Sequence, residues 1–196
     1  MQAQLHNHII QLVPSLQKEA GEIAASFKQE NYGKGEIVVR EGQAVSKLYF
    51  VNKGCLHLYF TDSDGSQNTI HFALENWWMT EYNAFLGNPQ AAFGIGAIED
   101  TEAMTIAKDE FDQLLIRYPL MGAYFNIIHM RAYGASLLKQ KTFATVNKKD
   151  FHLYFTTHYP AFVKRVPHTI LASYMGISPE ELAVFNSNFP NKAGMV

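Results

Sequence analysis

The sequence predicts an α+β fold with three parts: a jelly roll (double-stranded β-helix) over residues 1–118, a long helix over 119–146 and a small all-α unit over 147–196. In the first part, short apolar runs alternate with frequent turn signals, which is typical of a jelly roll or small barrel. The second part begins with a proline and then continues without another. The third part has the spacing of a helix-turn-helix.

The N-terminal 25 residues are predicted to form two short helices before the roll begins. Two apolar stripes repeat at helical spacing, and Pro14 separates them. The first stripe consists of Leu5, Ile9, Leu12 and Val13, and the second of Leu16, Ala20 and Ile23.

Strands are predicted in the roll at Glu36–Arg40, Leu48–Val51 and Cys55–Phe60, where β-branched and aromatic residues gather. The pair Asp64-Gly65 lies between two apolar runs, which is a strong hairpin signal. Several short strands joined by close turns favour a closed roll over an open sheet.

The long helix has two apolar stripes, whereas a surface helix of a single domain needs one. The first stripe consists of Met121, Phe125, Ile128, Ala132, Ala135 and Leu138. The second is spaced as a heptad and predicts a homodimer interface formed by Leu120, Ala123, Ile127, Met130, Gly134 and Leu137. The alternative is a helix that is buried in one core.

The last fifty residues contain signals for two helices joined by a tight turn. Gly176 is expected to end the first helix in a left-handed cap. Ser178 and Glu181 form a capping box for the second helix, with Pro179 in its first turn. An ordinary helical hairpin is the alternative to a helix-turn-helix.

Composition limits the classes of protein that need to be considered. The chain has 196 residues, and its 47% hydrophobic content is enough for a substantial core. The single cysteine, Cys55, excludes an intrachain disulfide and a zinc site of several cysteines, and it fits a reducing cytoplasm. Neither a secretory signal nor a transmembrane run of about 18 apolar residues is visible, so we expect no membrane association.

Charge gives a weak indication of nucleic-acid binding. The formal net charge is −2, which does not by itself favour a nucleic-acid partner. Basic side chains nevertheless outnumber acidic ones within residues 147–196, whereas acidic ones predominate in the rest of the chain.

The order of these parts resembles the Crp/Fnr family of bacterial transcription regulators. Residues 35–42 (GEIVVREG) and 48–54 (LYFVNKG) are similar to the family's first strands and glycine turn. Residues 97–102 (AIEDTE) and 165–182 resemble segments of a Bacteroidetes-type subgroup. The resemblance implies a cyclic-nucleotide-binding-like roll, a homodimer through the long helix and a winged-helix-like DNA-binding unit.

The resemblance also implies where an effector would bind. Glu81 stands where the family has a ribose-binding glutamate, and Thr80 replaces a glycine. Ala91 and Ala92 stand where the family has the arginine and serine or threonine that hold the cyclic phosphate. Because a buried phosphate needs a cation or several donors, we do not expect cyclic AMP to bind in the family manner.

The predicted effector pocket consists of Trp78, Thr80, Glu81, Tyr82, Phe85, Ala91 and Ala92. Its aromatic rings favour a less charged, planar or apolar effector of unidentified structure. The alternative is that the rings simply fill the roll.

The predicted DNA-binding residues are Lys164, Arg165, Ser178, Pro179, Glu180 and Val184. Pro179 and Val184 stand where the family's recognition helix has arginines, the side chains that read guanine. The sequence therefore leaves two functions open: a DNA-binding regulator, or a sensor or interaction module that no longer reads DNA.

Enzymatic function is not expected. A cupin-like metal enzyme needs a His-x-His pattern with a further carboxylate and histidine, and the roll's His57 and His71 lack that spacing. We expect no metal, no cofactor and no catalytic residues.

Overall fold

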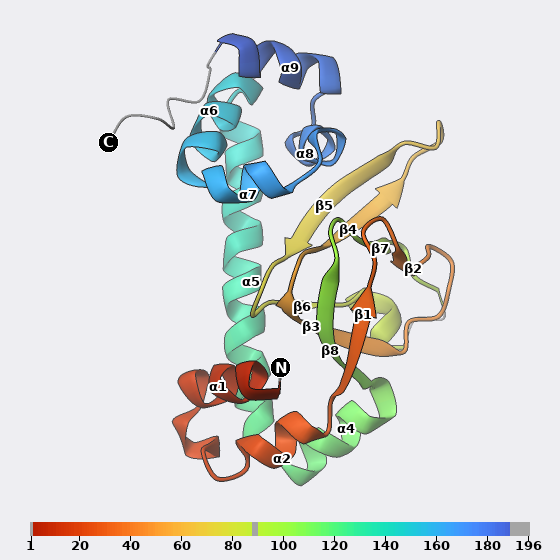
Figure 1. Ribbon diagram of the computed structural model, residues 1–196, viewed down its shortest axis with the longest axis vertical. Helices are drawn as coiled ribbons and strands as arrows, with labels where there is room; N and C mark the ends of the chain where they lie inside the picture. The colour runs from red at the N-terminus through yellow and green to blue at the C-terminus, as the bar shows by residue number, and fades with distance from the viewer. Residues whose placement is uncertain (1, 88–89, 189–196) are drawn as a thin grey trace.

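The protein consists of a β roll, a long helix that runs beside it and helical groups at the two ends of that helix (Figure 1). The computed structural model describes residues 2–87 and 90–188. This arrangement confirms the predicted α+β fold.

Eight strands in the described residues form two four-stranded sheets, in which every pairing is antiparallel. The first sheet has the order β1-β8-β3-β6 and the second the order β2-β7-β4-β5. The strands are β1 Lys28–Tyr32, β2 Ile37–Val39, β3 Lys47–Lys53, β4 Leu56–Thr61, β5 Gln67–Ala73, β6 Trp78–Met79, β7 Gly94–Ala97 and β8 Thr101–Ala107. Side chains from both sheets, including Leu48, Leu56 and Ile95, share one buried core.

The predicted hairpin is confirmed between β4 and β5. Gly65 has a φ of +88°, which a glycine adopts without steric cost. The Asp62 carboxylate accepts from the backbone N–H groups of Asp64 and Ser66, each at 3.2 Å. These bonds stabilise the turn. The hairpin of β4 and β5 projects from the rest of the roll (Figure 1).

Helices close one end of the roll. The predicted N-terminal pair is confirmed as α1 (Gln2–Leu12) and α2 (Ala20–Ala25), with a 3-10 turn η1 (Pro14–Leu16) between them. Leu5, Ile9 and Ile23 are fully buried in the core of the roll. Two further helices are α3 (Tyr82–Phe85) and α4 (Lys108–Arg117).

The long helix α5 (Leu120–Thr145) has Pro119 as its N-terminal cap residue, as the sequence predicted. In its N-terminal half, Met121, Tyr124 and Phe125 are buried against the roll. Near its C-terminal end, Lys139 donates to the carbonyl of Ile70 at 2.7 Å, and the Phe143 ring lies 5.1 Å from that of Phe151 by centroid. Most of the second apolar stripe is exposed: the exposed fractions are 66% for Met130 and 46% for Leu137, whereas Ile127 is partly buried against the core of the roll.

Four helices form the C-terminal unit within residues 147–188: α6 (Lys148–His158), α7 (Pro160–Arg165), α8 (His168–Met175) and α9 (Pro179–Asn188). This described part contains no strand, so it shows no wing. Among the described residues, no helix combines the length and apolarity needed to span a membrane.

Candidate effector site and helix-turn-helix

The predicted effector segment begins with two polar side chains that are already bonded within the protein. Glu81 caps α3: its carboxylate accepts from the N–H groups of Asn83, at 3.3 Å, and Ala84, at 2.9 Å. The Thr80 hydroxyl donates to the carbonyl of Lys47 at 2.8 Å. Both residues are 2% exposed, and their side chains make these hydrogen bonds to backbone groups of the protein itself.

Ala91 and Ala92 lie in the loop that leads into β7. The backbone of Ala91 is fixed against the β2–β3 connection, since its N–H donates to Gln43 and its carbonyl accepts from Gly42, both at 2.8 Å. Its side chain is buried, and that of Ala92 is exposed. The two positions therefore supply only methyl groups.

The aromatic residues of the predicted pocket divide into two groups. Trp78 and Phe85 lie in the core: Trp78 packs against Phe27, Phe50 and Phe125 at ring-centroid distances of 5.0 to 5.6 Å. Tyr82 lies at the surface, 36% exposed, with its ring 5.2 Å from that of His129 on α5. The rings of Trp78 and Phe85 thus pack in the protein interior, and their contact with an effector stays a prediction.

A surface hollow of about 400 Å³ adjoins the C-terminal end of α3. Its border includes Phe85, Leu86, Gly87 and Val45, together with Lys108. The Lys108 ammonium pairs with the Asp112 carboxylate and lies 5.7 Å from the centroid of the Phe85 ring. This cation is therefore partnered, and it does not replace the arginine that the family pattern places near position 91. Among the described residues, no three His, Cys, Asp or Glu side chains gather where they could hold a metal.

The helix-turn-helix has the local geometry that the sequence predicted. Gly176 adopts a φ of +66° and closes α8. Ser178 and Glu181 exchange the two bonds of a capping box: the Ser178 Oγ accepts from the Glu181 N–H at 3.1 Å, and the Glu181 carboxylate accepts from the Ser178 N–H at 2.9 Å. His152 of α6 holds α9 through Asn186, at 2.9 Å between Nε2 and Oδ1.

The exposed surface of α9 is acidic and apolar. Its first turn carries Glu180 and Glu181, Val184 is 55% exposed, and the helix contains neither lysine nor arginine. Lys164 is exposed at the end of α7. The predicted DNA contacts Pro179, Glu180 and Val184 thus face solvent but provide no positive charge.

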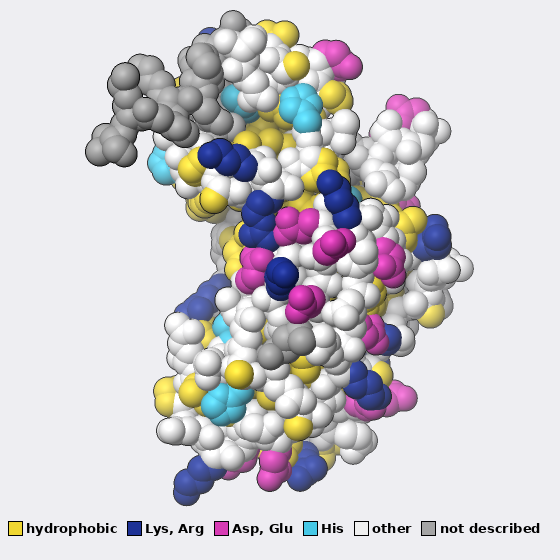
Figure 2. Space-filling view, in the orientation of Figure 1, with side chains coloured by type: hydrophobic (Ala, Val, Ile, Leu, Met, Phe, Trp, Pro, Cys, Tyr) yellow, Lys and Arg dark blue, Asp and Glu magenta, His cyan; other side chains and the backbone are white. Residues whose placement is uncertain are grey.

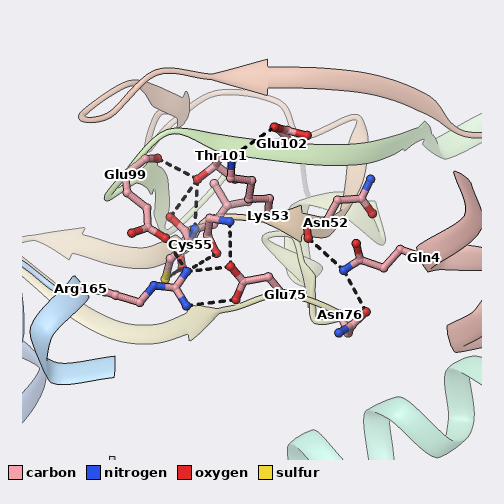
Figure 3. A network of polar contacts seen from close by, with 12 residues as sticks. Gln4, Asn52, Lys53, Cys55, Glu75, Asn76, Glu99, Thr101, Glu102 and Arg165 are labelled. Carbon is pink, nitrogen blue, oxygen red and sulfur yellow. Dashed lines mark hydrogen bonds and ion pairs between the residues drawn. The ribbon is translucent and has the colours of Figure 1, made fainter. Parts of the chain in front are cut away.

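Arg165 is engaged by the roll (Figure 3). Its Nη1 and Nη2 donate to the two oxygens of Glu75 at 3.1 and 2.8 Å. Nη2 also donates to Glu99 at 2.5 Å and to the carbonyl of Gly54 at 3.2 Å. Figure 2 shows acidic and basic side chains gathered across the middle of this face, where the helical unit meets the roll.

Sequence reasoning missed Glu75 and Glu99 as partners of Arg165, and Tyr124 as a buried polar residue. Glu99 lies within the segment 97–102 that resembles the subgroup pattern, but nothing local assigns it a partner. Turns of the roll bring Glu75 and Glu99 to Arg165, and the packing of α5 on the roll buries Tyr124, so only the tertiary structure reveals them.

Residues 29–118 match the family model of the cyclic nucleotide-binding domain. No curated protein matches the chain. The matched residues run from the second residue of β1 to just beyond α4 and include strands β2 to β8.

Solved structures of transcription regulators have the same fold at low sequence identity. FixK2 from Bradyrhizobium japonicum is similar with a TM-score of 0.72 and 14% identity, over 86% of this chain and 89% of that one. CLP, the c-di-GMP responsive global regulator of Xanthomonas campestris, has a TM-score of 0.66 and 17% identity, over 84% and 87%. TTHA1359 of the CRP/FNR family, from Thermus thermophilus, has a TM-score of 0.64 and 14% identity, over 85% and 87%.

Residues 29–118 are therefore similar to the cyclic nucleotide-binding domain. The chain as a whole has the fold of the Crp/Fnr transcription regulators, which confirms the resemblance at the level of the fold. The subgroup assignment stays a prediction.

Proposed function

We propose that the protein is a homodimeric transcription regulator of the Crp/Fnr type and not an enzyme. In this proposal an effector binds the roll, the long helices α5 pair, and the helix-turn-helix units bind DNA. The observation that carries the proposal is the uncovered stripe on α5, because it lies between the roll and the helix-turn-helix. Leu120, Met130 and Leu137 are each at least 46% exposed there, and apolar residues at heptad spacing are suited to pairing with a second copy.

The chemistry of the effector segment supports a ligand other than cyclic AMP. Ala91 and Ala92 provide no cation, and the carboxylate of Glu81 is used by the N–H groups of α3. A buried cyclic phosphate would therefore lack a partner for its charge. The exposed ring of Tyr82 favours a planar or apolar molecule.

A second function, a sensor or interaction module without sequence-specific DNA binding, is favoured by the surface of α9. That helix carries no basic side chain, and the Arg165 guanidinium donates to carboxylates of the roll. A helix of this composition would bind DNA weakly, because phosphate contacts depend on lysine and arginine.

Fluorescence anisotropy distinguishes the two functions. The purified protein is titrated against labelled DNA from upstream of its own gene and against a scrambled duplex, across a salt series. Preference for the upstream duplex that persists at about 150 mM salt would support the regulator. Equal and weak binding to both duplexes, lost at that salt concentration, would favour the interaction module.

A further inference from the structure

Three turns at one end of the roll converge on the guanidinium of Arg165. Glu75 follows β5, Glu99 joins β7 to β8, and Gly54 joins β3 to β4. We call Arg165, these two carboxylates and the Gly54 carbonyl the Arg165 clasp. Because its acceptors all belong to the roll and its donor belongs to the helical unit, the clasp joins the two across the boundary between them (Figure 3).

The acceptors of the clasp are held in place by the roll itself. Gly54 has a φ of +94°, and a Cβ there would lie 2.6 Å from the carbonyl oxygen of Asp100. The Gly54 N–H donates to Glu75 at 3.0 Å, which orients the carboxylate toward the arginine. Arg165 therefore meets a preformed site, so little side-chain entropy of the acceptors is lost on docking.

An apolar seam lies beside the clasp. Cys55, Phe72 and Ile98 of the roll share one buried cluster with residues of the helical unit. The Phe72 ring lies 4.9 Å from the rings of both Phe162 and Tyr174, by centroid. The N–H of Thr69 on β5 also donates to the Ser173 hydroxyl of α8 at 3.1 Å.

The partly buried setting strengthens the ion pairs. The side chains of Arg165, Glu75 and Glu99 are 34%, 33% and 28% exposed, and the fork of the guanidinium matches both oxygens of Glu75. Burial raises the pKa of Glu75, but the hydrogen bonds from Arg165 and from the backbone N–H groups of Glu75 and Gly54, together with the charge of Arg165, outweigh it, so that the pKa falls below its ordinary value. Bonds to the two carboxylates raise the pKa of Arg165. Arg165 and Glu75 are therefore both charged at neutral pH.

We propose that the Arg165 clasp holds the helical unit docked on the roll in a closed arrangement of low DNA affinity, and that its rupture frees the unit. This inference rests on the proposed function. In the closed arrangement, two carboxylates face one guanidinium, which leaves a net negative charge where a DNA phosphate would have to approach. Rupture exposes Arg165 to solvent and to phosphates.

The clasp has a direct connection to the predicted effector segment. The short strand β7 begins three residues after Ala91 and ends two residues before Glu99. All four of its residues are buried, and it pairs with β2 and β4. A displacement of the loop at Ala91 and Ala92 would therefore be passed along a rigid strand to a carboxylate of the clasp.

Hydrogen exchange of the full-length protein tests whether the clasp holds the unit. In Arg165→Ala, exchange in β5 and in α8 should accelerate by about fivefold or more, because both elements lose their docking contacts. Lys164→Ala is the matched control: it removes the same charge from the adjacent exposed residue, and exchange should stay as in the wild type. Far-UV circular dichroism checks that each variant is folded.

The double variant Glu75→Gln and Glu99→Gln opens the clasp while it keeps Arg165. It should show the same faster exchange and bind the upstream duplex about threefold more tightly than a charge-matched control. That control, Glu41→Gln with Glu102→Gln, removes two carboxylates from the roll outside the clasp.

The outcomes separate this inference from the proposed function. Unchanged exchange in both clasp variants would overturn the clasp, whatever the DNA result. Faster exchange with DNA affinity equal to that of the charge-matched control would overturn the low-affinity closed state. Faster exchange with no DNA binding by any variant would overturn the proposed function and, with it, the role of the clasp in DNA binding.

Discussion

Trp78 and Tyr124 are joined by a buried hydrogen bond: the indole Nε1–H donates to the phenolic oxygen at 3.0 Å. The bond links β6 of the roll to the long helix α5, 46 residues further along the chain. Nδ1 of His8, on α1, lies 2.6 Å from the same oxygen. A single hydroxyl thus joins three elements where the roll meets the helix.

Tyr124→Phe should lower the free energy of unfolding by about 1–3 kcal/mol, because the buried N–H of Trp78 loses its acceptor. Urea denaturation followed by tryptophan fluorescence measures the change. Tyr133→Phe is the matched control, since Tyr133 lies on the same helix and is 68% exposed. Equal losses in the two variants would contradict a specific role for the buried bond.

Acid should destabilise the fold through His57. This side chain is 5% exposed, and burial lowers its pKa to about 4. The unfolded chain takes up a proton below about pH 6.5, whereas the folded protein keeps the ring neutral down to about pH 4. The contribution of His57 to the free energy of unfolding is therefore fully present above pH 6.5 and is lost as the pH falls toward 4. The loss amounts to about 3 kcal/mol, because each pH unit costs about 1.4 kcal/mol.

Denaturation curves between pH 4 and 7 test this expectation, with His57→Gln as the variant. The slope of the unfolding free energy against pH should become shallower. His168→Gln replaces an exposed histidine and should leave the slope as it is. A wild-type slope in His57→Gln would show that other groups cause the acid sensitivity.

Gly94→Ala should destabilise the roll, because the new methyl group would lie 2.5 Å from Cζ of Tyr59. The ring cannot move aside easily, since it stacks on His57 at a centroid distance of 5.0 Å. We expect a loss of about 1–3 kcal/mol in thermal or urea unfolding. Gly21→Ala is the control: nothing lies within 4 Å of its added Cβ, and alanine in a helix should stabilise by up to about 1 kcal/mol. A neutral Gly94→Ala would mean that the strand and ring adjust without cost.

Met130→Glu with Leu137→Glu should convert the expected dimer into monomers, because two carboxylates per helix would face their copies across the interface. Sedimentation velocity measures the mass, and circular dichroism checks the fold. Ser136→Glu adds a carboxylate to an exposed position away from the heptad stripe and should leave the dimer intact. A wild-type protein that sediments as a monomer would refute the dimer.

Elements with short-range signals were predictable from the sequence. The hairpin at Gly65, the cap at Gly176 and the capping box of Ser178 and Glu181 involve residues at most four positions apart. Their hydrogen bonds and their demand for positive φ belong to the local backbone. The alternation of apolar residues then indicated which segments form strands, and this established the fold class.

Sequence reasoning was weaker for the aromatic residues of the predicted pocket. Trp78 and Tyr82 lie four residues apart and look equally suited to line it. The structure buries Trp78, because β6 pairs with β3 and places the indole against α5. Tyr82 stays at the surface of α3.

The sequence by itself determined the order of roll, long helix and helix-turn-helix, because periodicity and capping act within a few residues. Only the tertiary structure decided the surroundings of Arg165. As a basic residue beside a helix-turn-helix, it was predicted to contact DNA, yet its partners Glu75 and Glu99 lie 90 and 66 residues away in the chain. Which charges meet over such separations depends on strand register and on how the turns converge, and neither follows from neighbouring residues.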